Sequence, residues 1–274
     1  MTFPNTLAFI GGGNMARSLI GGLSARGMAP RQIIVADPLS SQLESLAAQY
    51  GVRITADNSV AAAAADVLVL AVKPQQMRQA ATDVAAALSR HALIVSVAAG
   101  IKACDLQIWC GGLPVVRCMP NRAALHGCGI TALYAAADVS AGAKQTAQSI
   151  LSAVGATLWV EHEAQMDAVT ALSGSGPAYF FLLAEILEQT GISLGLSPEV
   201  SRQLATATAH GAGCMLRDTQ ETPAKLREQV TSKAGTTEAA LEHLEANNVR
   251  AIFAAAVTAA ARRSAVLAQE YGER

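Results

Sequence analysis

Short apolar runs of strand length recur through the first 120 residues, and they constrain the fold of this chain more than any other feature. The runs are TLAFI, QIIVAD, VLVLAV, ALIVSVA and PVVRCM, at residues 6–10, 32–37, 67–72, 92–98 and 114–119. Uninterrupted apolar runs of this length are typical of strands buried on both faces of a parallel sheet. Helical patterns separate them at residues 13–26, 39–49, 75–88 and 102–110. This alternation predicts an α/β fold with a doubly wound sheet, to which strands near 128–134 and 156–161 would be added.

The strand pattern stops near residue 163, and the remainder reads as helices. Their expected ranges are 163–172, 177–194, 198–217, 223–230, 236–247 and 249–271, with one break at the SGSGP stretch. A chain of 274 residues is long for one hydrophobic core. We therefore expect a second, all-helical domain over residues 163–274. Small residues crowd its helices, which favours an intersubunit bundle, although tight packing within the chain explains them almost as well.

A glycine-rich turn follows the first apolar run directly. It reads Gly11-Gly12-Gly13-Asn14-Met15-Ala16, the pattern G-x-G-x-x-A. Gly11 permits the tight turn, Gly13 lets the backbone approach a pyrophosphate, and Ala16 allows close packing of helix on strand. The turn precedes a helix whose free N–H groups favour phosphate. Residues 1–162 are therefore expected to form a Rossmann-type dinucleotide-binding domain.

The second strand ends in Asp37, at the distance from the glycines where an acid binds a cofactor ribose. Such an acid favours NAD and repels the 2′-phosphate of NADP. Ser40 and Ser41 follow at once and open the next helix, where N–H and hydroxyl donors suit a phosphate. The residues alone leave the choice between NADH and NADPH open.

Two more loops leave the carboxyl ends of strands, where open α/β sheets bind their ligands. They are residues 71–74, with the sequence AVKP, and residues 97–100, with the sequence VAAG. Small residues there let a nicotinamide ribose lie against backbone. Lys73 is read as a positioning group, with a catalytic acid as the alternative. The predicted cofactor contacts are Gly11, Gly13, Asn14, Met15, Asp37, Ser40, Asn58, Ala71, Val72, Lys73, Pro74, Ala98 and Ala99.

The stretch Ser173-Gly174-Ser175-Gly176-Pro177 stands in front of a long apolar run. With Pro177 at a helix start, the residues before it could expose backbone N–H groups to a small anion such as a carboxylate. A similar loop, residues 230–237 with the sequence VTSKAGTT, precedes the helical pattern EAALEHL. Each loop alone is read more simply as a helix cap. Together with a dinucleotide site they predict two walls around one small polar substrate.

Charge and composition exclude other classes of function. The net charge is −1, aromatic residues are 4%, and no Lys/Arg-rich run occurs, so we expect no nucleic-acid partner. The apolar stretches 177–187 and 251–261 read as too short to span a membrane, and no secretory leader is visible; a cytoplasmic protein is expected. The five cysteines are scattered and expected to be reduced. No spacing typical of a metal site occurs.

Six motifs occur together in the order found in one enzyme family. They are AFIGGGNMA, AVKPQ, VSVAAGI, RCMPN, VTALSGSGPAYFF and VTSKAGTTEAAL, and the chain resembles pyrroline-5-carboxylate reductase over essentially its whole length. The resemblance implies reduction of 1-pyrroline-5-carboxylate to L-proline by NAD(P)H, the last step of proline biosynthesis, with NADPH favoured. It also implies that the helical domain interlocks two subunits in a dimer, which often assembles further into a decamer.

Two positions depart from the usual pattern of that family. Arg122-Ala123 stands where Thr-Pro is common, and Lys233-Ala234 where Pro-Gly is common. Replacement of a glycine restricts positive φ angles, so the geometry of the second loop is the point in question. Because Gly235, Thr236 and Thr237 remain, we expect the activity to remain.

Reduction of a cyclic imine asks the protein mainly to align two reactants and exclude water. This suits a sequence with no triad, metal site or carboxylate pair. Thr237 is the predicted catalytic residue, as a hydrogen-bond donor near the imine nitrogen. The predicted contacts of the substrate, including its carboxylate, are Ser175, Gly176, Gly235, Thr236 and Thr237.

Two other functions fit parts of the sequence. A β-hydroxyacid dehydrogenase of similar architecture would use a lysine as acid and base on the helix between its domains, but no lysine follows SGSGPAY before Lys225. A non-catalytic redox sensor would bind dinucleotide and a partner protein. Such a sensor has no use for two anion-binding loops.

Overall fold

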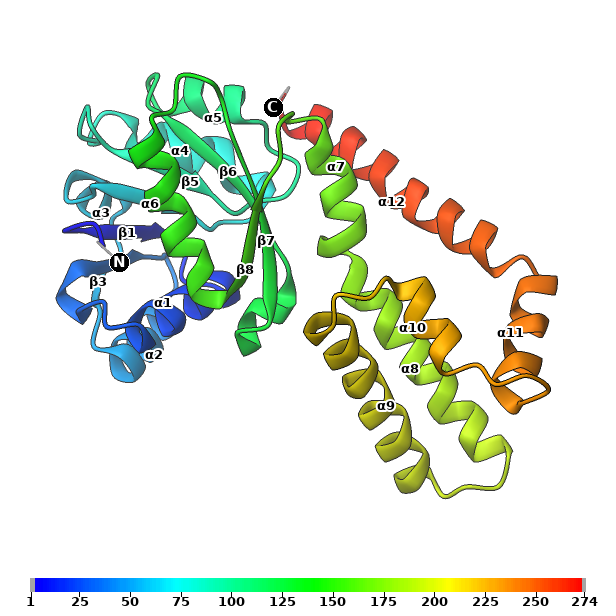
Figure 1. Cartoon of the computed structure of the whole chain (residues 1–274). Helices are drawn as coiled ribbons and strands as arrows, with labels where there is room; N and C mark the ends of the chain where they lie inside the picture. The colour runs from blue at the N-terminus through cyan, green and yellow to red at the C-terminus, as the bar shows by residue number, and fades with distance from the viewer. Residues whose placement is uncertain (1–2, 273–274) are drawn as a thin grey trace. The chain divides into compact units, whose positions relative to one another are not determined.

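The computed structural model of the chain describes residues 3–272 and contains one eight-stranded sheet in the order β3-β2-β1-β4-β5-β6-β7-β8 (Figure 1). All neighbouring strands are parallel except β6 and β7, which pair antiparallel. The first six strands have the order of a doubly wound dinucleotide-binding fold, as predicted. The strands are β1 Leu7–Ile10, β2 Ile33–Ala36, β3 Arg53–Thr55, β4 Val67–Leu70, β5 Leu93–Ser96, β6 Val115–Pro120, β7 Gly129–Ala135 and β8 Gly155–Trp159.

Helices cover both faces of this sheet. Strands β1, β2, β4 and β5 are therefore buried along their whole length. One layer holds α1 (Asn14–Ala25), α2 (Ser40–Tyr50) and α6 (Ala141–Leu151). The other holds α3 (Asn58–Ala63), α4 (Met77–Ala85) and α5 (Ala103–Trp109). Short 3₁₀ helices η1 (Pro30–Gln32), η2 (Pro74–Gln76), η3 (Arg122–His126) and η4 (Ser152–Val154) lie in the connections.

Three elements of this domain were not predicted. Strand β3 is a mostly exposed edge strand, so its sequence RIT lacks the apolar run that marks the buried strands. Helix α3 is short and rich in alanine, and Asp57 caps it by accepting from the Ser59 N–H at 2.8 Å. Helix α6 begins after Ser140, whose hydroxyl caps the Ala143 N–H. Strand β3 and helix α3 are too short to show a clear period.

The helical part comprises α7 (Gln165–Val169), a π-helical turn η5 (Thr170–Gly174), α8 (Gly176–Ser193), α9 (Pro198–Asp218), α10 (Pro223–Gln229), α11 (Thr236–Ala246) and α12 (Val249–Gly272). Contacts divide the chain into two compact units. One contains residues 1–175 and 260–274, and the other contains residues 176–259. This division differs from the predicted boundary at 162/163, since the end of α12 belongs with the sheet.

At the expected break in the SGSGP stretch, a π turn over Thr170–Gly174 and a bend at Ser175 precede the start of α8 at Gly176, while the helical path as a whole runs over Gln165–Ser193. The π turn absorbs the irregularity: the Ser175 N–H donates to the Thr170 carbonyl at 2.8 Å, five residues back. Pro177 follows this turn, and a proline has no N–H to donate and its ring crowds the preceding turn of a helix. A side chain at Gly174 would collide with the terminal methyl of Met119. The Met119 side chain of the RCMPN segment thus packs directly against Gly174.

Large apolar side chains are exposed along α8 and α12. Phe180 is 65% exposed, Phe181 66% and Ile252 62%. The helices Gln165–Ser193 and Val249–Gly272 have 29 and 24 residues and are apolar enough, by length and composition alone, to cross a membrane. The expectation that these stretches are too short is therefore wrong, because the helices extend beyond the apolar runs seen in the sequence. Exposed apolar faces of this size also mark interfaces between subunits.

The five cysteines are all free, as predicted. Burial raises the pKa of Cys110 to about 12 and also raises the pKa of Cys118 from its ordinary value. Both thiols therefore stay protonated and pack as small apolar groups.

Candidate cofactor and substrate site

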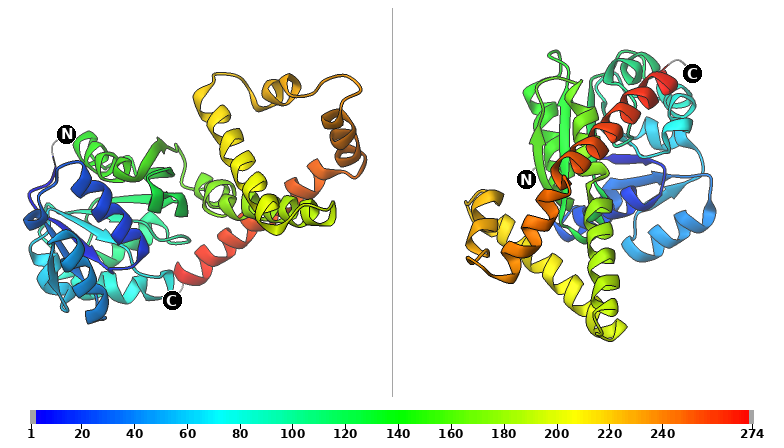
Figure 2. Two further views of the ribbon diagram at one scale, coloured as in Figure 1. Left: turned by 90° about the horizontal axis from the view of Figure 1, so that it is seen from below. Right: turned by 90° about the vertical axis from the view of Figure 1, so that its right-hand side faces the viewer.

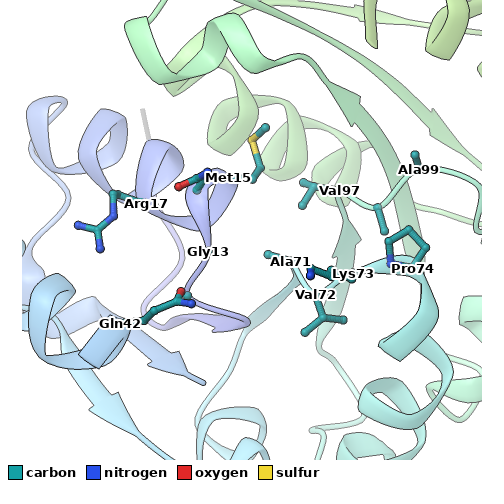
Figure 3. Close-up of a pocket in the computed structure, with 13 residues that line it drawn as sticks. Gly13, Met15, Arg17, Gln42, Ala71, Val72, Lys73, Pro74, Val97 and Ala99 are labelled. Carbon is teal, nitrogen blue, oxygen red and sulfur yellow. The ribbon is translucent and has the colours of Figure 1, made fainter. Parts of the chain in front are cut away.

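A cavity of about 600 Å³ opens at the carboxyl ends of β1, β4 and β5. The strand order reverses between β1 and β4, and this is the point where doubly wound sheets bind their ligands. Figure 3 shows Arg17 and Gln42 at one end of the cavity and Lys73, Pro74 and Ala99 at the other. The lining residues are Gly12, Gly13, Asn14, Met15, Arg17, Gln42, Ala71, Val72, Lys73, Pro74, Val97, Ala98 and Ala99.

The glycine-rich turn has the geometry that its sequence predicts. Gly11 has a φ of 98°, and a Cβ atom there would lie 2.8 Å from the Ala71 carbonyl oxygen. Gly13 has a φ of −69°, which any residue adopts, and no atom lies within 4 Å of where its Cβ would be. Gly11 is therefore required by the fold itself. At Gly13 the missing side chain leaves open space in front of the first N–H groups of α1, where a pyrophosphate fits.

Asp37 holds the turn instead of facing open solvent. It is 8% exposed. One carboxylate oxygen accepts from the Gly12 N–H at 2.7 Å and the other from the Leu39 N–H at 2.8 Å. The carboxylate thereby ties the glycine-rich turn to the start of α2.

Nine of the thirteen predicted cofactor contacts line the cavity together, and four do not: Gly11, Asp37, Ser40 and Asn58. Gly11 and Asp37 lie next to Gly12 in structure. Ser40 and Asn58 begin α2 and α3. Two other lining residues, Arg17 and Gln42, were not predicted, because neither belongs to a recognisable sequence pattern. The Arg17 guanidinium donates to Gln49 Oε1 at 2.7 Å and Ser45 Oγ at 3.1 Å.

The two predicted substrate residues of the SGSGP stretch lie inside the continuous helix. Ser175 follows the π turn, and Gly176 is the buried first residue of α8. The π turn leads directly into α8, so the Ser175 N–H donates to the Thr170 carbonyl at 2.8 Å instead of facing an anion. The π turn is the local irregularity that remains, and such turns are frequent at functional sites.

The second loop connects α10 to α11 and contains a strained residue. Ala234 has a φ of 58°, the left-handed region that favours glycine. Its N–H donates to Glu238 Oε2 at 2.6 Å. Gly235 then caps α11 with an extended backbone. The loop thus keeps a turn suited to glycine although alanine stands in it.

Replacing Ala234 by glycine is expected to stabilise the protein by about 0.5–1 kcal/mol, because relief of left-handed strain exceeds the added freedom of the unfolded chain. The melting temperature measures this. As a control, the exposed Ala240 inside α11 should give the opposite sign on replacement by glycine, a loss of about 1 kcal/mol. An equal loss at both positions would contradict the assignment of strain to Ala234.

Thr236 and Thr237 are the first two residues of α11, and Thr237 is half-buried. Within residues 3–272, no hydrogen bond to either hydroxyl is found, and the cap of α11 is Gly235. The hydroxyl of Thr237 is therefore not committed to capping the helix.

The described part of the chain contains no group of three or more His, Cys, Asp or Glu side chains able to hold a metal ion. The polar groups that line the cavity include the side chains of Asn14 and Gln42 and the cations of Arg17 and Lys73.

Comparison with known sequences identifies two matching family models. The model described as pyrroline-5-carboxylate reductase dimerisation matches residues 163–267. The model described as NADP oxidoreductase coenzyme F420-dependent matches residues 6–100, which contain the glycine-rich turn and the loops around the cavity.

Full-length relatives agree with these matches. Pyrroline-5-carboxylate reductase from Pseudomonas aeruginosa is 49% identical over 268 residues, covering 97% of this chain and 98% of the relative. The structure of the reductase from Coxiella burnetii is 39% identical, with a TM-score of 0.92 over 97% of this chain and 99% of that chain. The reductase from Plasmodium falciparum, solved with NADP bound, is 26% identical, with a TM-score of 0.85 over 97% and 100%. The chain therefore belongs to the pyrroline-5-carboxylate reductase family of oxidoreductases.

Proposed function

We propose that this enzyme reduces 1-pyrroline-5-carboxylate to L-proline with NADPH, the last step of proline biosynthesis, and that it also accepts NADH. The observation that carries the proposal is the cavity over the glycine-rich turn, in a chain 49% identical to a pyrroline-5-carboxylate reductase over 97% of its length. The substrate is a small molecule with a carboxylate. The proposal includes a soluble, cytoplasmic enzyme that binds neither nucleic acid nor membrane.

The residues around the cavity fit a dinucleotide. Gly12, Gly13 and Asn14 present the N-terminus of α1 to the pyrophosphate. Ala71, Val72, Ala98 and Ala99 have short side chains, so the flat nicotinamide and its ribose can lie against backbone at the other end. Lys73 adds a positive charge at that end. When bound, the dinucleotide supplies the hydride.

The remaining chemistry is assigned to the helical residues. The imine nitrogen of the substrate is basic, and protonation makes its carbon an electrophile. The Thr237 hydroxyl can donate to and accept from this nitrogen, so it serves the imine and then the product amine. Ser175, Gly176, Gly235 and Thr236 are assigned to the substrate around it, including its carboxylate. Alignment of the two reactants and exclusion of water are then the main contributions of the protein.

An assay with synthetic substrates tests the function. NADPH oxidation should be steady with 1-pyrroline-5-carboxylate, and reduction of NADP⁺ should be absent with β-hydroxyacids. Turnover of hydroxyacids would instead favour the dehydrogenase alternative. Binding of NADPH without turnover of either substrate would favour the redox sensor.

Replacing Asp37 by serine or asparagine is expected to lower kcat/KM by about tenfold with both cofactors, since the buried carboxylate accepts one charged hydrogen bond from the turn and one from the start of α2. The ratio of kcat/KM for NADPH to that for NADH should change little. Steady-state kinetics with NADPH and with NADH measures both kcat/KM values and their ratio. A marked rise of the ratio, with NADPH activity retained, would mean that Asp37 faces the ribose directly.

We propose a homodimer formed through the helical unit, with a decamer built from such dimers as the larger assembly that the family resemblance implies. The dimerisation match over residues 163–267 covers α8, α9 and most of α12, which carry the exposed apolar side chains. Sedimentation at micromolar concentration should give a dimer or a multiple of it. A monomer alone would contradict the proposal.

A further inference from the structure

The last turns of α12 pack on the unit that contains the sheet. Residues 260–274 belong to that unit, while α12 begins at Val249 in the other. Ser264 is 3% exposed, and its hydroxyl donates to Asp167 Oδ1 at 2.7 Å. Ala268, one turn later, is buried. Figure 2 shows this C-terminal end of α12, in red, beside the sheet-containing unit in both views. The end of the chain is thus docked by specific contacts.

Tyr271 stands in these last turns and touches two loops at once. Gln75 Nε2, in η2 directly after the cavity residues Lys73 and Pro74, donates to the Tyr271 hydroxyl at 3.0 Å. The ring lies against Gly100: a Cβ atom there would be 3.4 Å from Tyr271 Cδ2. Gly100 has a φ of 73° and ends the loop that contributes Val97, Ala98 and Ala99 to the cavity.

We propose that Tyr271 is a positioning residue for the nicotinamide end of the cofactor cavity, fixing the 71–75 and 97–100 loops relative to each other through its hydroxyl and its ring. The inference rests on the proposed binding of NADPH in this cavity. Tyr271 lies beyond the dimerisation match, which ends at residue 267.

The local structure of the first loop explains why it requires a partner. Helix η2 has three residues, and no side chain caps its start. Gln75 and Gln76 are exposed. Backbone order of so short a segment depends on contacts from outside it. The hydroxyl of Tyr271 supplies one such contact, from a ring that packs against the core beneath α4 and α5.

The test is NADPH binding, followed by cofactor fluorescence, in Tyr271→Phe and Gln75→Leu. Each removes the same hydrogen bond from one side, and each should weaken NADPH binding by about threefold to tenfold. The KM for NADPH should rise by a similar factor while kcat at saturating NADPH stays unchanged. The double variant should bind no more weakly than the weaker single variant, because the two changes remove one interaction. Tyr271→Ala, which also removes the ring, should have a larger effect.

Arg263→Gln is the matched control. It removes an exposed ion pair with Glu270 on the same end of α12, at 3.0 Å, without touching either loop, and should leave NADPH binding unchanged. If Tyr271→Phe and Gln75→Leu change only the melting temperature, Tyr271 has a structural role and the inference is overturned. NADPH binding is measured without substrate, so it tests the role of Tyr271 independently of the reaction. If the proposed function is wrong, the unsubstituted protein will bind NADPH but will not reduce 1-pyrroline-5-carboxylate.

Discussion

A Gly13→Ala variant will melt at the temperature of the unsubstituted protein and bind NADPH about tenfold to a hundredfold more weakly, the effect of forcing one methyl group into a filled site. The fold tolerates the change for two reasons. Gly13 has a φ of −69°, and no atom lies within 4 Å of the new methyl group. That open space is where the proposed pyrophosphate approaches the backbone.

The neighbouring glycine provides the contrast. Gly11→Ala should lower stability even without cofactor, because the new methyl group would lie 2.8 Å from the Ala71 carbonyl oxygen at a φ of 98°. Gly27→Ala, with a φ of 90° and no atom within 4 Å of the new group, separates backbone strain from collision. Thermal melts and NADPH titrations on the three variants measure both effects. Unchanged NADPH binding in Gly13→Ala would place the pyrophosphate elsewhere.

A Thr237→Val variant will lose about tenfold to a hundredfold in kcat/KM for 1-pyrroline-5-carboxylate, the equivalent of one hydrogen bond of roughly 1.5–3 kcal/mol to a charged group. Valine keeps the shape of threonine and removes only the polar atom. Since the cap of α11 is Gly235, stability should change little. If the bond forms mainly in the transition state, kcat and kcat/KM fall together, whereas a rise in KM alone would indicate uniform binding.

Thr222→Val is the control for this prediction. The Thr222 hydroxyl caps α10 by accepting from the Lys225 N–H at 3.3 Å, so its loss should cost on the order of 1 kcal/mol of stability and leave kcat/KM unchanged. The two threonines should thus respond in opposite ways. Reduced stability with normal kinetics in Thr237→Val would remove Thr237 from the active site.

The sequence alone predicted the elements with strong local signals. Uninterrupted apolar runs mark strands buried on both faces, and the glycine-rich turn after β1 indicates a dinucleotide fold, because its backbone geometry requires glycine at Gly11. The edge strand β3 and the short α3 were missed, since an exposed or brief element carries little periodicity. Alanine in place of glycine at Ala234 raised the question of whether this loop keeps a left-handed turn, and the structure has that turn.

Other features depend on contacts between residues far apart in the chain. The SGSGP stretch reads as a helix break in sequence, yet the helix continues through a π turn, with Met119 of β6 packed against Gly174. The carboxylate of Asp37 reads as a ribose ligand, yet both its oxygens accept from backbone N–H groups. Tyr271 carries no motif and is brought to Gln75 by the docking of α12. Periodicity and turn chemistry are local and can be read residue by residue, whereas the partner of a polar side chain is decided only when distant segments are packed together.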